Sequence, residues 1–262
     1  MLYVNGKVCL GVIITIILLA GCGSYEDSDK AGLREPSGIA SSAVDNSQYP
    51  AVVKVILPEG RGLCSGTFIS PRAVLTAGHC ATEDGRYTIR ASFGTFSTSQ
   101  KVSLVASMEV DNPNDLSILI LDQDVASEQA GQIMRIADGV GAGDEVRLVG
   151  FGCNNLETRT GSGVKRTGTN QVWRVSEYID LLTPQSDQRS SRAIIGAENR
   201  AGSCFGDSGG PMFTANGLVG VAHAGGKYGS DYLSEYTNVG REDNRQYLVN
   251  ANNTYNLRIP GL

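Results

Sequence analysis

The sequence has little of what several protein classes require. Its 262 residues include only two histidines, six cysteines and one tryptophan, and no Cys-x-x-Cys pair occurs. Zinc sites need such clusters or neighbouring histidines, so no metal site is expected, and we predict no cofactor. The 22 basic and 27 acidic side chains give a net charge of −5. This balance lacks the basic excess of a nucleic-acid-binding protein, so no such partner is predicted.

Long hydrophobic runs are also missing, and the longest, Val8–Ala20, is interrupted by Gly11 and Thr15. A run of about 13 residues is too short for a membrane-spanning helix, which needs about 20. The run follows the basic residue Lys7 and precedes small residues. This arrangement is typical of an export signal that is removed from the mature protein.

The end of this segment carries a more specific targeting signal. Residues 18–22 read Leu-Leu-Ala-Gly-Cys, which resembles the lipobox of bacterial lipoproteins. The resemblance implies a signal peptide over residues 1–21 and a lipid group on Cys22. It implies export and lipid anchoring at the bacterial cell envelope, where Gly23 in place of an aspartate favours the outer membrane. The alternative is an ordinary signal peptide that ends near a cysteine by chance.

A polar segment follows the lipidation site. Residues 24–37 are polar or charged and include few large apolar side chains. As a flexible coil, a segment of about 16 residues would reach roughly 20–24 Å. We therefore assign residues 22–38 to a lipidated tether or pro-segment, and residues 39–262 to the folded domain.

The cysteine count agrees with export. Cys9 is removed with the signal and Cys22 receives the lipid, which leaves an even number of cysteines for an oxidising compartment. Two disulfides are therefore predicted, and the count alone allows three pairings. The four remaining residues are Cys64, Cys80, Cys153 and Cys204.

The rest of the chain is rich in turn residues, with 33 glycines and 8 prolines. Short apolar runs between such residues favour an all-β sandwich or barrels over long helices. A terminal helix is predicted at Asp243–Ala251. The predicted strands are 51–57, 66–69, 73–76, 87–93, 101–105, 116–121, 145–150, 171–179, 193–195, 211–213 and 218–222.

The sharpest motif is Gly-Asp-Ser-Gly-Gly-Pro at residues 206–211. A serine hydroxyl is a poor nucleophile until a neighbouring base takes its proton. The flanking glycines let the backbone bend and leave Ser208 exposed. The Gly-x-Ser-x-Gly turn of α/β-hydrolases has the same letters, but there an acid and then a histidine follow the serine. No acidic residue lies between Ser208 and His223, which disfavours that alternative.

The base must be one of the two histidines. His79 lies in Thr-Ala-Gly-His-Cys, and Asp115 opens the run Asp-Leu-Ser-Ile-Leu, where a lone acid is often only a strand cap. The order His79, Asp115, Ser208 with these flanking motifs resembles the trypsin/chymotrypsin-like serine proteases. The resemblance extends from about Ile39 to the C-terminus.

The resemblance implies an all-β fold of two six-stranded antiparallel β-barrels packed around a cleft, with a boundary near residues 130–140. It implies a serine endopeptidase in which His79 takes the proton of Ser208 and Asp115 orients His79. The N–H groups of Gly206 and Ser208 would form the oxyanion hole. The implied partners of a monomeric enzyme are protein or peptide substrates. The alternative is a catalytically silent, protease-like binding lipoprotein.

The resemblance also assigns disulfides and a specificity pocket. Cys64–Cys80 matches the family's bridge around the histidine loop, and Cys153–Cys204 is the second predicted pair. The pocket residues are Gly202, Gly225 and Ser234. The floor of the pocket, at Gly202, carries no charge, so a lysine or arginine side chain buried there would have no partner. We therefore expect small or medium apolar residues at P1, the residue before the cleaved bond. Glu235 would restore a basic preference if its carboxylate turned inward.

Two positions depart from the family pattern. Activation would pair a new N-terminus at Ile39 with Asp207, yet Gly38 rather than a basic residue precedes the cut. Such a cut would free the enzyme from its lipid, so release outside the cell is the alternative to anchorage. His223 replaces the serine that the family commonly has behind the aspartate. It is either a structural histidine or a competitor of His79 for Asp115.

Overall fold

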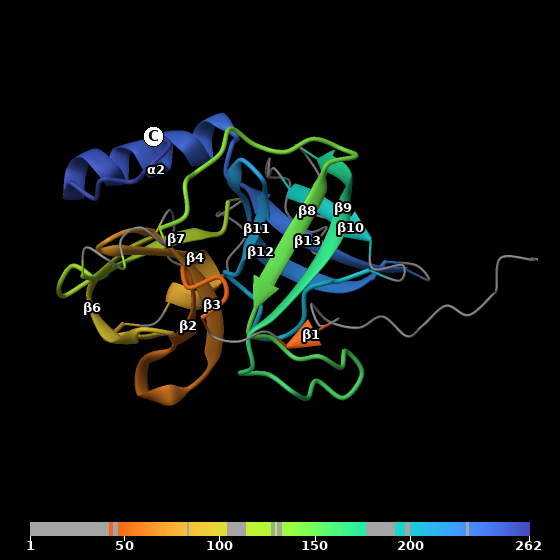
Figure 1. The fold of residues 1–262 in the computed structure, drawn as a ribbon, viewed down its shortest axis with the longest axis horizontal. Helices are drawn as coiled ribbons and strands as arrows, with labels where there is room; N and C mark the ends of the chain where they lie inside the picture. Colours follow the sequence, from red (N-terminus) through yellow and green to blue (C-terminus); the bar gives the residue numbers. More distant parts are fainter. Residues whose placement is uncertain are drawn as a thin grey trace, which may run out of the picture. The chain divides into compact units, whose positions relative to one another are not determined.

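The fold of the described residues is shown in Figure 1. In this computed structural model they are 42–43, 47–82, 84–103, 114–126, 129, 133–176, 192–196, 200–228 and 231–262. All of them belong to the unit formed by residues 33–262. The predicted signal peptide and tether, with Cys22 and Ile39, lie outside the described residues. In the described ranges, no helix has the length and apolar character needed to cross a membrane.

Six antiparallel strands close a first barrel. They are β2 (Val52–Ile56), β3 (Leu63–Ser70), β4 (Ala73–Ala77), β5 (Thr88–Ala91), β6 (Gly94–Ser103) and β7 (Leu116–Leu121). They pair in the order β2-β3-β4-β7-β6-β5. The β-branched and aliphatic residues of these strands fit a pleated, buried surface. Phe68, Tyr87 and Ile89 are buried in the interior. A short 3-10 turn, η1 (Pro58–Gly60), links β2 to β3.

The second half is a curled sheet of seven strands. They are β1 (Ser42–Ala43), β8 (Glu145–Gly150), β9 (Arg166–Ser176), β10 (Arg192–Gly196), β11 (Pro211–Thr214), β12 (Gly217–Tyr228) and β13 (Asp231–Asn238). The order is β1-β9-β10-β13-β12-β11-β8, and β8 also pairs with β9. Six strands therefore close a ring, and β1 adds to it at β9. The predicted two-barrel fold is confirmed.

A C-terminal helix, α2 (Glu242–Tyr255), packs on a hydrophobic cluster shared by both halves. Figure 1 shows this helix in dark blue above the first barrel. It begins with two acidic residues, which suit the positive end of the helix dipole. Its buried residues Tyr247 and Leu248 belong to one cluster with Leu116 of the first barrel and Leu218 of the second. The helix therefore helps to hold the two halves in a fixed relation, which a site between them requires.

Candidate active site

The register of the first barrel brings His79 and Asp115 together. His79 lies in η2 (Gly78–Ala81), a 3-10 turn that directly follows β4. Asp115 directly precedes β7, and Ala77 of β4 pairs with Leu116 of β7. Both residues therefore leave the barrel at the same end. The backbone of Asp115 has a φ of 47°. This left-handed conformation is tolerated better by aspartate than by bulkier residues.

Within the described part of the chain, the carboxylate of Asp115 accepts hydrogen bonds from both histidines. The His79 N–H donates to Oδ1 at 2.7 Å, and the His79 Nδ1 lies 2.9 Å from Oδ2. The Nδ1 of His223 lies 2.6 Å from the same Oδ2. Because an ionised carboxylate only accepts, we assign the proton of each imidazole to Nδ1. The Nε2 of His79 is then left with a lone pair that can accept a proton.

Asp115 keeps its negative charge despite its burial. Burial by itself would raise the pKa of this carboxyl group. The hydrogen bonds and charge interactions with His223 and His79 outweigh burial and hold the pKa well below its usual range. A permanent anion behind His79 stabilises the imidazolium that forms when this side chain takes a proton.

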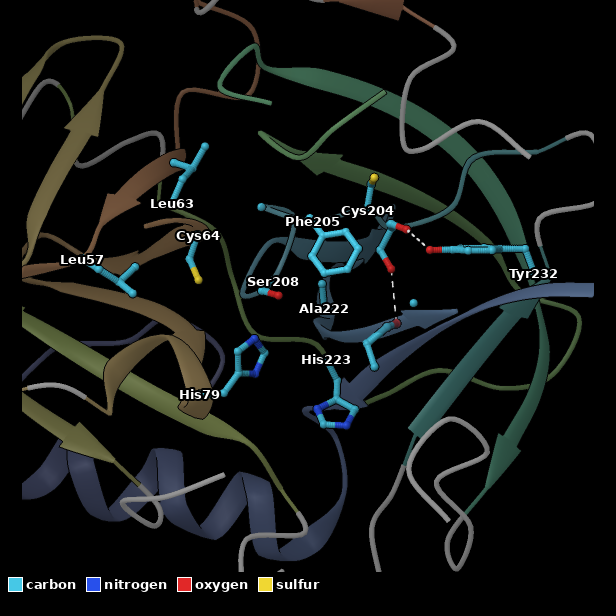
Figure 2. Close-up of a pocket in the computed structure, with 14 residues that line it drawn as sticks. Leu57, Leu63, Cys64, His79, Cys204, Phe205, Ser208, Ala222, His223 and Tyr232 are labelled. Carbon is cyan, nitrogen blue, oxygen red and sulfur yellow. Dashed lines mark hydrogen bonds between the residues drawn. The ribbon is translucent and has the colours of Figure 1, made fainter. Parts of the chain in front are cut away.

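Ser208 and the two histidines line one pocket of ≈ 490 Å³. In Figure 2, the side chains of His79 and Ser208 both point into it, from opposite halves of the molecule. The remaining lining residues are Leu57, Leu63, Cys64, Ser203, Cys204, Phe205, Gly206, Ala222, Ala224, Gly225 and Tyr232. The three residues named by the sequence motifs are thus close in space: Asp115 touches His79, and His79 shares a pocket with Ser208.

The loop that carries Ser208 is held by the buried side chain of Asp207. Its Oδ1 accepts from the Gly152 N–H at 2.7 Å and its Oδ2 from the Cys204 N–H at 2.9 Å. Gly206 has a φ of 98°, a conformation that favours glycine. Among the described residues, the N–H groups of Gly206 and Ser208 donate to no acceptor. These two donors are therefore available to a ligand in the pocket.

Sequence reasoning missed Ser65, which fastens this loop to the first barrel. Ser65 is fully buried in β3, and its N–H donates to the Ser208 carbonyl at 2.8 Å. Its hydroxyl donates to the Gly206 carbonyl at 2.8 Å and accepts from the Phe151 N–H at 3.0 Å. The one available signal was its position beside Cys64, in a segment already expected to approach the histidine loop.

The structure contains both predicted disulfides. Cys64–Cys80 joins β3 to the turn that carries His79, and Cys153–Cys204 joins the loop after β8 to the segment before Ser208. Both bridges therefore lie next to the pocket and restrain its loops from opposite sides. Disulfides persist in oxidising compartments, so their presence fits an exported protein.

Comparison with known proteins identifies the family. The family model described as Trypsin matches residues 39–242, well over half of the chain. The chain belongs to the trypsin family. A trypsin of Saccharopolyspora erythraea is 27% identical over 191 residues, which are 68% of this chain and 82% of that protein. Trypsin beta of Drosophila erecta is 25% identical over 236 residues, 81% and 87% of the two chains.

Solved structures agree on the fold. Mouse neuropsin, a serine protease, superposes with a TM-score of 0.65 at 18% identity, covering 85% of this chain and all (100%) of neuropsin. An inactivated protease paralogue of the scabies mite gives a TM-score of 0.64 at 14% identity, covering 86% and 99%. These two likenesses establish the chymotrypsin-like fold, and the trypsin family places the chain among the serine endopeptidases.

The specificity residues expected for a trypsin-family pocket are only partly at its surface. Gly225 lines the pocket, whereas Gly202 and Ser234 are buried and are not among the lining residues. The Ser234 hydroxyl lies behind the wall and accepts from the Ser203 N–H at 2.8 Å. Glu235 is fully buried and does not line the pocket. Sequence reasoning missed Tyr232, which lines the pocket together with Ser203.

Two clusters in the described residues have the composition of metal ligands. One is His79 with Cys64 and Cys80, but these cysteines form a disulfide and offer no thiolate. The other is His79, Asp115 and His223, with ligand atoms within 4.8 Å of one another. The hydrogen bonds from both imidazoles to Asp115 account for this closeness without an ion.

The role of His223 beside Asp115 can be tested by mutation. Replacing His223 with alanine removes one donor to a buried carboxylate, and such bonds contribute about 1.5–3 kcal/mol. We expect His223→Ala to lower the free energy of unfolding by about this amount in urea titrations. His223→Ser, whose hydroxyl can still donate, is the matched control and should lose less. Two hydrogen bonds still hold His79, so kcat/KM should stay within about tenfold of wild type, which corresponds to about 1.4 kcal/mol of transition-state stabilisation. An increase in kcat/KM would show instead that His223 competes with His79.

Proposed function

We propose that the chain is an active serine endopeptidase whose catalytic residues are Ser208, His79 and Asp115. The observation that carries the proposal is the pair of hydrogen bonds from His79 to Asp115, at 2.7 and 2.9 Å. They fix the imidazole in the tautomer whose Nε2 can accept a proton, in the pocket that Ser208 shares. Membership of the trypsin family supports the same assignment.

The mechanism follows from these positions. The Nε2 of His79 takes the proton of the Ser208 hydroxyl as the serine oxygen attacks a peptide carbonyl. The imidazolium then returns the proton to the leaving amine, and an acyl-enzyme remains. A water molecule then attacks the acyl carbonyl while His79 takes its proton. His79 returns this proton to the Ser208 oxygen, and the carboxylic acid product leaves. Throughout, Asp115 holds the imidazole and stabilises its cation, as in the Ser-His-Asp template.

The oxyanion of the tetrahedral intermediate would be held by the N–H groups of Gly206 and Ser208. Both donors are free of acceptors among the described residues, and Asp207, Ser65 and a disulfide hold their loop. Such preorganised donors act only when negative charge develops, and losing one costs about 2.7–4 kcal/mol of transition-state stabilisation. The arrangement therefore favours acyl transfer over ground-state binding.

Substrate choice and location complete the proposal. Proteins or peptides with small or medium apolar P1 residues are the expected substrates. Gly225 is at the surface of the pocket, and Gly202 and Ser234 are buried beneath that surface. We place a signal peptide at residues 1–21, a lipidated tether at 22–38 and the protease domain at 39–262. The enzyme would be a monomer anchored through Cys22 at the cell envelope, with the outer membrane favoured.

Activation would pair a terminal ammonium at Ile39 with Asp207. Strand β1 lies on the edge of the second sheet, where Ala43 pairs with Arg166 of β9. A terminus at Ile39 would begin three residues before β1, a reach of about 10 Å at full extension. A cut at this point would also separate the domain from its lipid anchor and release it from the membrane.

A fluorophosphonate probe tests the catalytic assignment directly, because it reacts only with an activated serine. Wild-type protein should be labelled on Ser208, as mapped by mass spectrometry, and the Ser208→Ala variant should not be labelled. His79→Ala should slow labelling by orders of magnitude while leaving both disulfides intact. A wild-type chain that resists the probe under all activation conditions would favour the silent binding protein instead.

A further inference from the structure

The part of the pocket that would receive a P1 side chain is bounded by two facing segments. Ser203, Cys204 and Phe205 form one wall ahead of Ser208. Ala222, Ala224 and Gly225 of β12 form the other. His79 and the leucines Leu57 and Leu63 lie on the opposite side of Ser208 (Figure 2). With the acyl carbon at Ser208 and the leaving amine at His79, the P1 side chain must enter between the two walls.

A hydrogen bond spans the space between these two walls, which we call the slot. The hydroxyl of Ser203 donates to the Ala224 carbonyl at 3.2 Å, so the two walls are joined by direct contact. Gly225 is crowded as well. A Cβ atom on this glycine would lie 2.8 Å from the Ser203 hydroxyl and 2.9 Å from the Ser203 carbonyl. These contacts leave little room between the two walls at this depth.

Tyr232 of β13 lies behind this contact. Its hydroxyl donates to the Ser203 carbonyl at 3.3 Å, and a Cβ atom on Gly225 would lie 3.1 Å from it. Figure 2 shows its ring at the far end of the pocket from His79, with the hydroxyl directed back toward the Ser203 segment. Burial, together with the charge of Asp207, raises the pKa of Tyr232 to about 12. The hydroxyl therefore remains a donor throughout the physiological range of pH.

We propose that Ser203 and Tyr232 close the P1 pocket at shallow depth, so that the enzyme selects P1 residues no larger than alanine or serine. This inference rests on the proposed function and narrows its small or medium apolar P1 class to small residues. Larger aliphatic or aromatic side chains would have to break the Ser203–Ala224 contact. Lysine and arginine are disfavoured further, because no acidic residue occurs among the described residues that line the pocket.

Peptide p-nitroanilides that differ only at P1 test the inference. We expect the kcat/KM of wild-type enzyme for the P1-Ala substrate to be at least about 100-fold above the values for P1-Phe and P1-Lys. The reason is that the narrow slot excludes the larger side chains. The double variant Ser203→Gly/Tyr232→Ala removes the crossing contact and the ring behind it. Its P1-Phe to P1-Ala ratio should rise by about tenfold or more. Trp173→Ala is the control, because it removes an exposed aromatic side chain that does not line the pocket, and it should keep the alanine preference.

Three outcomes separate this inference from the proposed function. Fluorophosphonate labelling with equal cleavage after alanine and phenylalanine would overturn the closed pocket and leave the protease standing. Labelling with the predicted ranking, changed by the double variant but not by Trp173→Ala, would support both. If wild type neither labels nor cleaves, peptides ending in Ala or Phe are titrated calorimetrically into the Ser208→Ala protein. Tighter binding of the Ala-terminated peptide then supports the closed pocket, and equal or weaker binding rejects it.

Discussion

Replacing Asp115 with asparagine is expected to lower kcat by about 10⁴-fold. The carboxylate accepts from the His79 N–H and from the Nδ1 of both His79 and His223. An asparagine side chain offers one acceptor oxygen and places an N–H₂ group where the second oxygen stood. Its amide would face at least one Nδ1–H. His79 would then adopt the other tautomer and lose the Nε2 lone pair that takes the Ser208 proton.

The measurement is kcat on a peptide substrate, normalised to correctly folded protein. Asp122→Asn is the matched control, because Asp122 follows β7 directly and forms an exposed ion pair with Arg86 at 2.6 Å. Exposed ion pairs contribute about 0–1 kcal/mol, so this variant should behave as wild type. A loss of less than about tenfold in Asp115→Asn would mean that another group orients the base.

Hydrophobic pattern located most of the strands but missed β13. Its sequence, Asp-Tyr-Leu-Ser-Glu-Tyr-Thr-Asn, has no apolar run or clean alternation. The strand is central, paired with β10 on one side and β12 on the other, and its polar residues Ser234, Glu235 and Thr237 are buried. Thr237 donates to the Asn114 carbonyl at 2.9 Å, a partner 123 residues away in sequence. Such burial depends on tertiary hydrogen bonds that local pattern does not reveal.

The same reason divides the site into predictable and unpredictable parts. The motifs that carry His79, Asp115 and Ser208 are local, and their chemistry can be inferred from residue type and order. Ser65 reaches Gly206 across 141 residues, and its role rests on a hydroxyl that could have pointed elsewhere. The resemblance located the pocket, but Tyr232 depends on the path of the β12–β13 hairpin. Family knowledge therefore supplied the reacting groups, while the structure supplied those that shape the space around them.

Removing the carboxylate of Asp207 is expected to lower kcat by about 10²–10³-fold, the effect of losing an oxyanion donor. In the Asp207→Ala variant the N–H groups of Gly152 and Cys204 lose their acceptors inside the protein. The segment from Cys204 to Ser208 then loses the hydrogen bonds that fix it. The Gly206 N–H is therefore no longer oriented toward the position of the oxyanion. The comparison is kcat at fixed pH for protein whose Cys153–Cys204 bridge is verified by mass spectrometry. Activity within tenfold of wild type would contradict this role.

The charge state of Asp207 makes the uncut chain sensitive to pH. Burial raises the pKa of Asp207 to about 7, although the Cys204 and Gly152 hydrogen bonds and the charge of Arg166 act in the opposite direction. A carboxyl group with a raised folded-state pKa favours folding while protonated. Its contribution is fully present below about pH 4 and is lost as pH rises through about 7. Full-length protein should therefore lose unfolding free energy over this interval, and Asp207→Asn should lose less.

A chain that begins at Ile39 should behave differently if its ammonium pairs with Asp207. The cation would favour the ionised carboxylate, lower its pKa and preserve stability above pH 7. Urea titrations of the full-length and Ile39-initiated proteins between pH 5 and 8.5 make the comparison. Parallel pH profiles for the two proteins would exclude this pairing.

The positive charge of Arg166 lowers the pKa of Asp207 and so opposes the effect of burial. Arg166 is buried, and its Nη1 donates to the Gly152 carbonyl at 2.9 Å, while the Gly152 N–H donates to Asp207. Gly152 thus links the buried guanidinium of Arg166 to the buried carboxylate of Asp207. Arg166→Gln should raise the pKa of Asp207 further, so the full-length variant should lose more unfolding free energy than wild type as pH rises from about 4 to 8.5. Arg61→Gln, which alters an exposed guanidinium, is the matched control and should leave the pH profile unchanged. An unchanged profile in Arg166→Gln would show that the field of Arg166 does not govern the Ser208 loop.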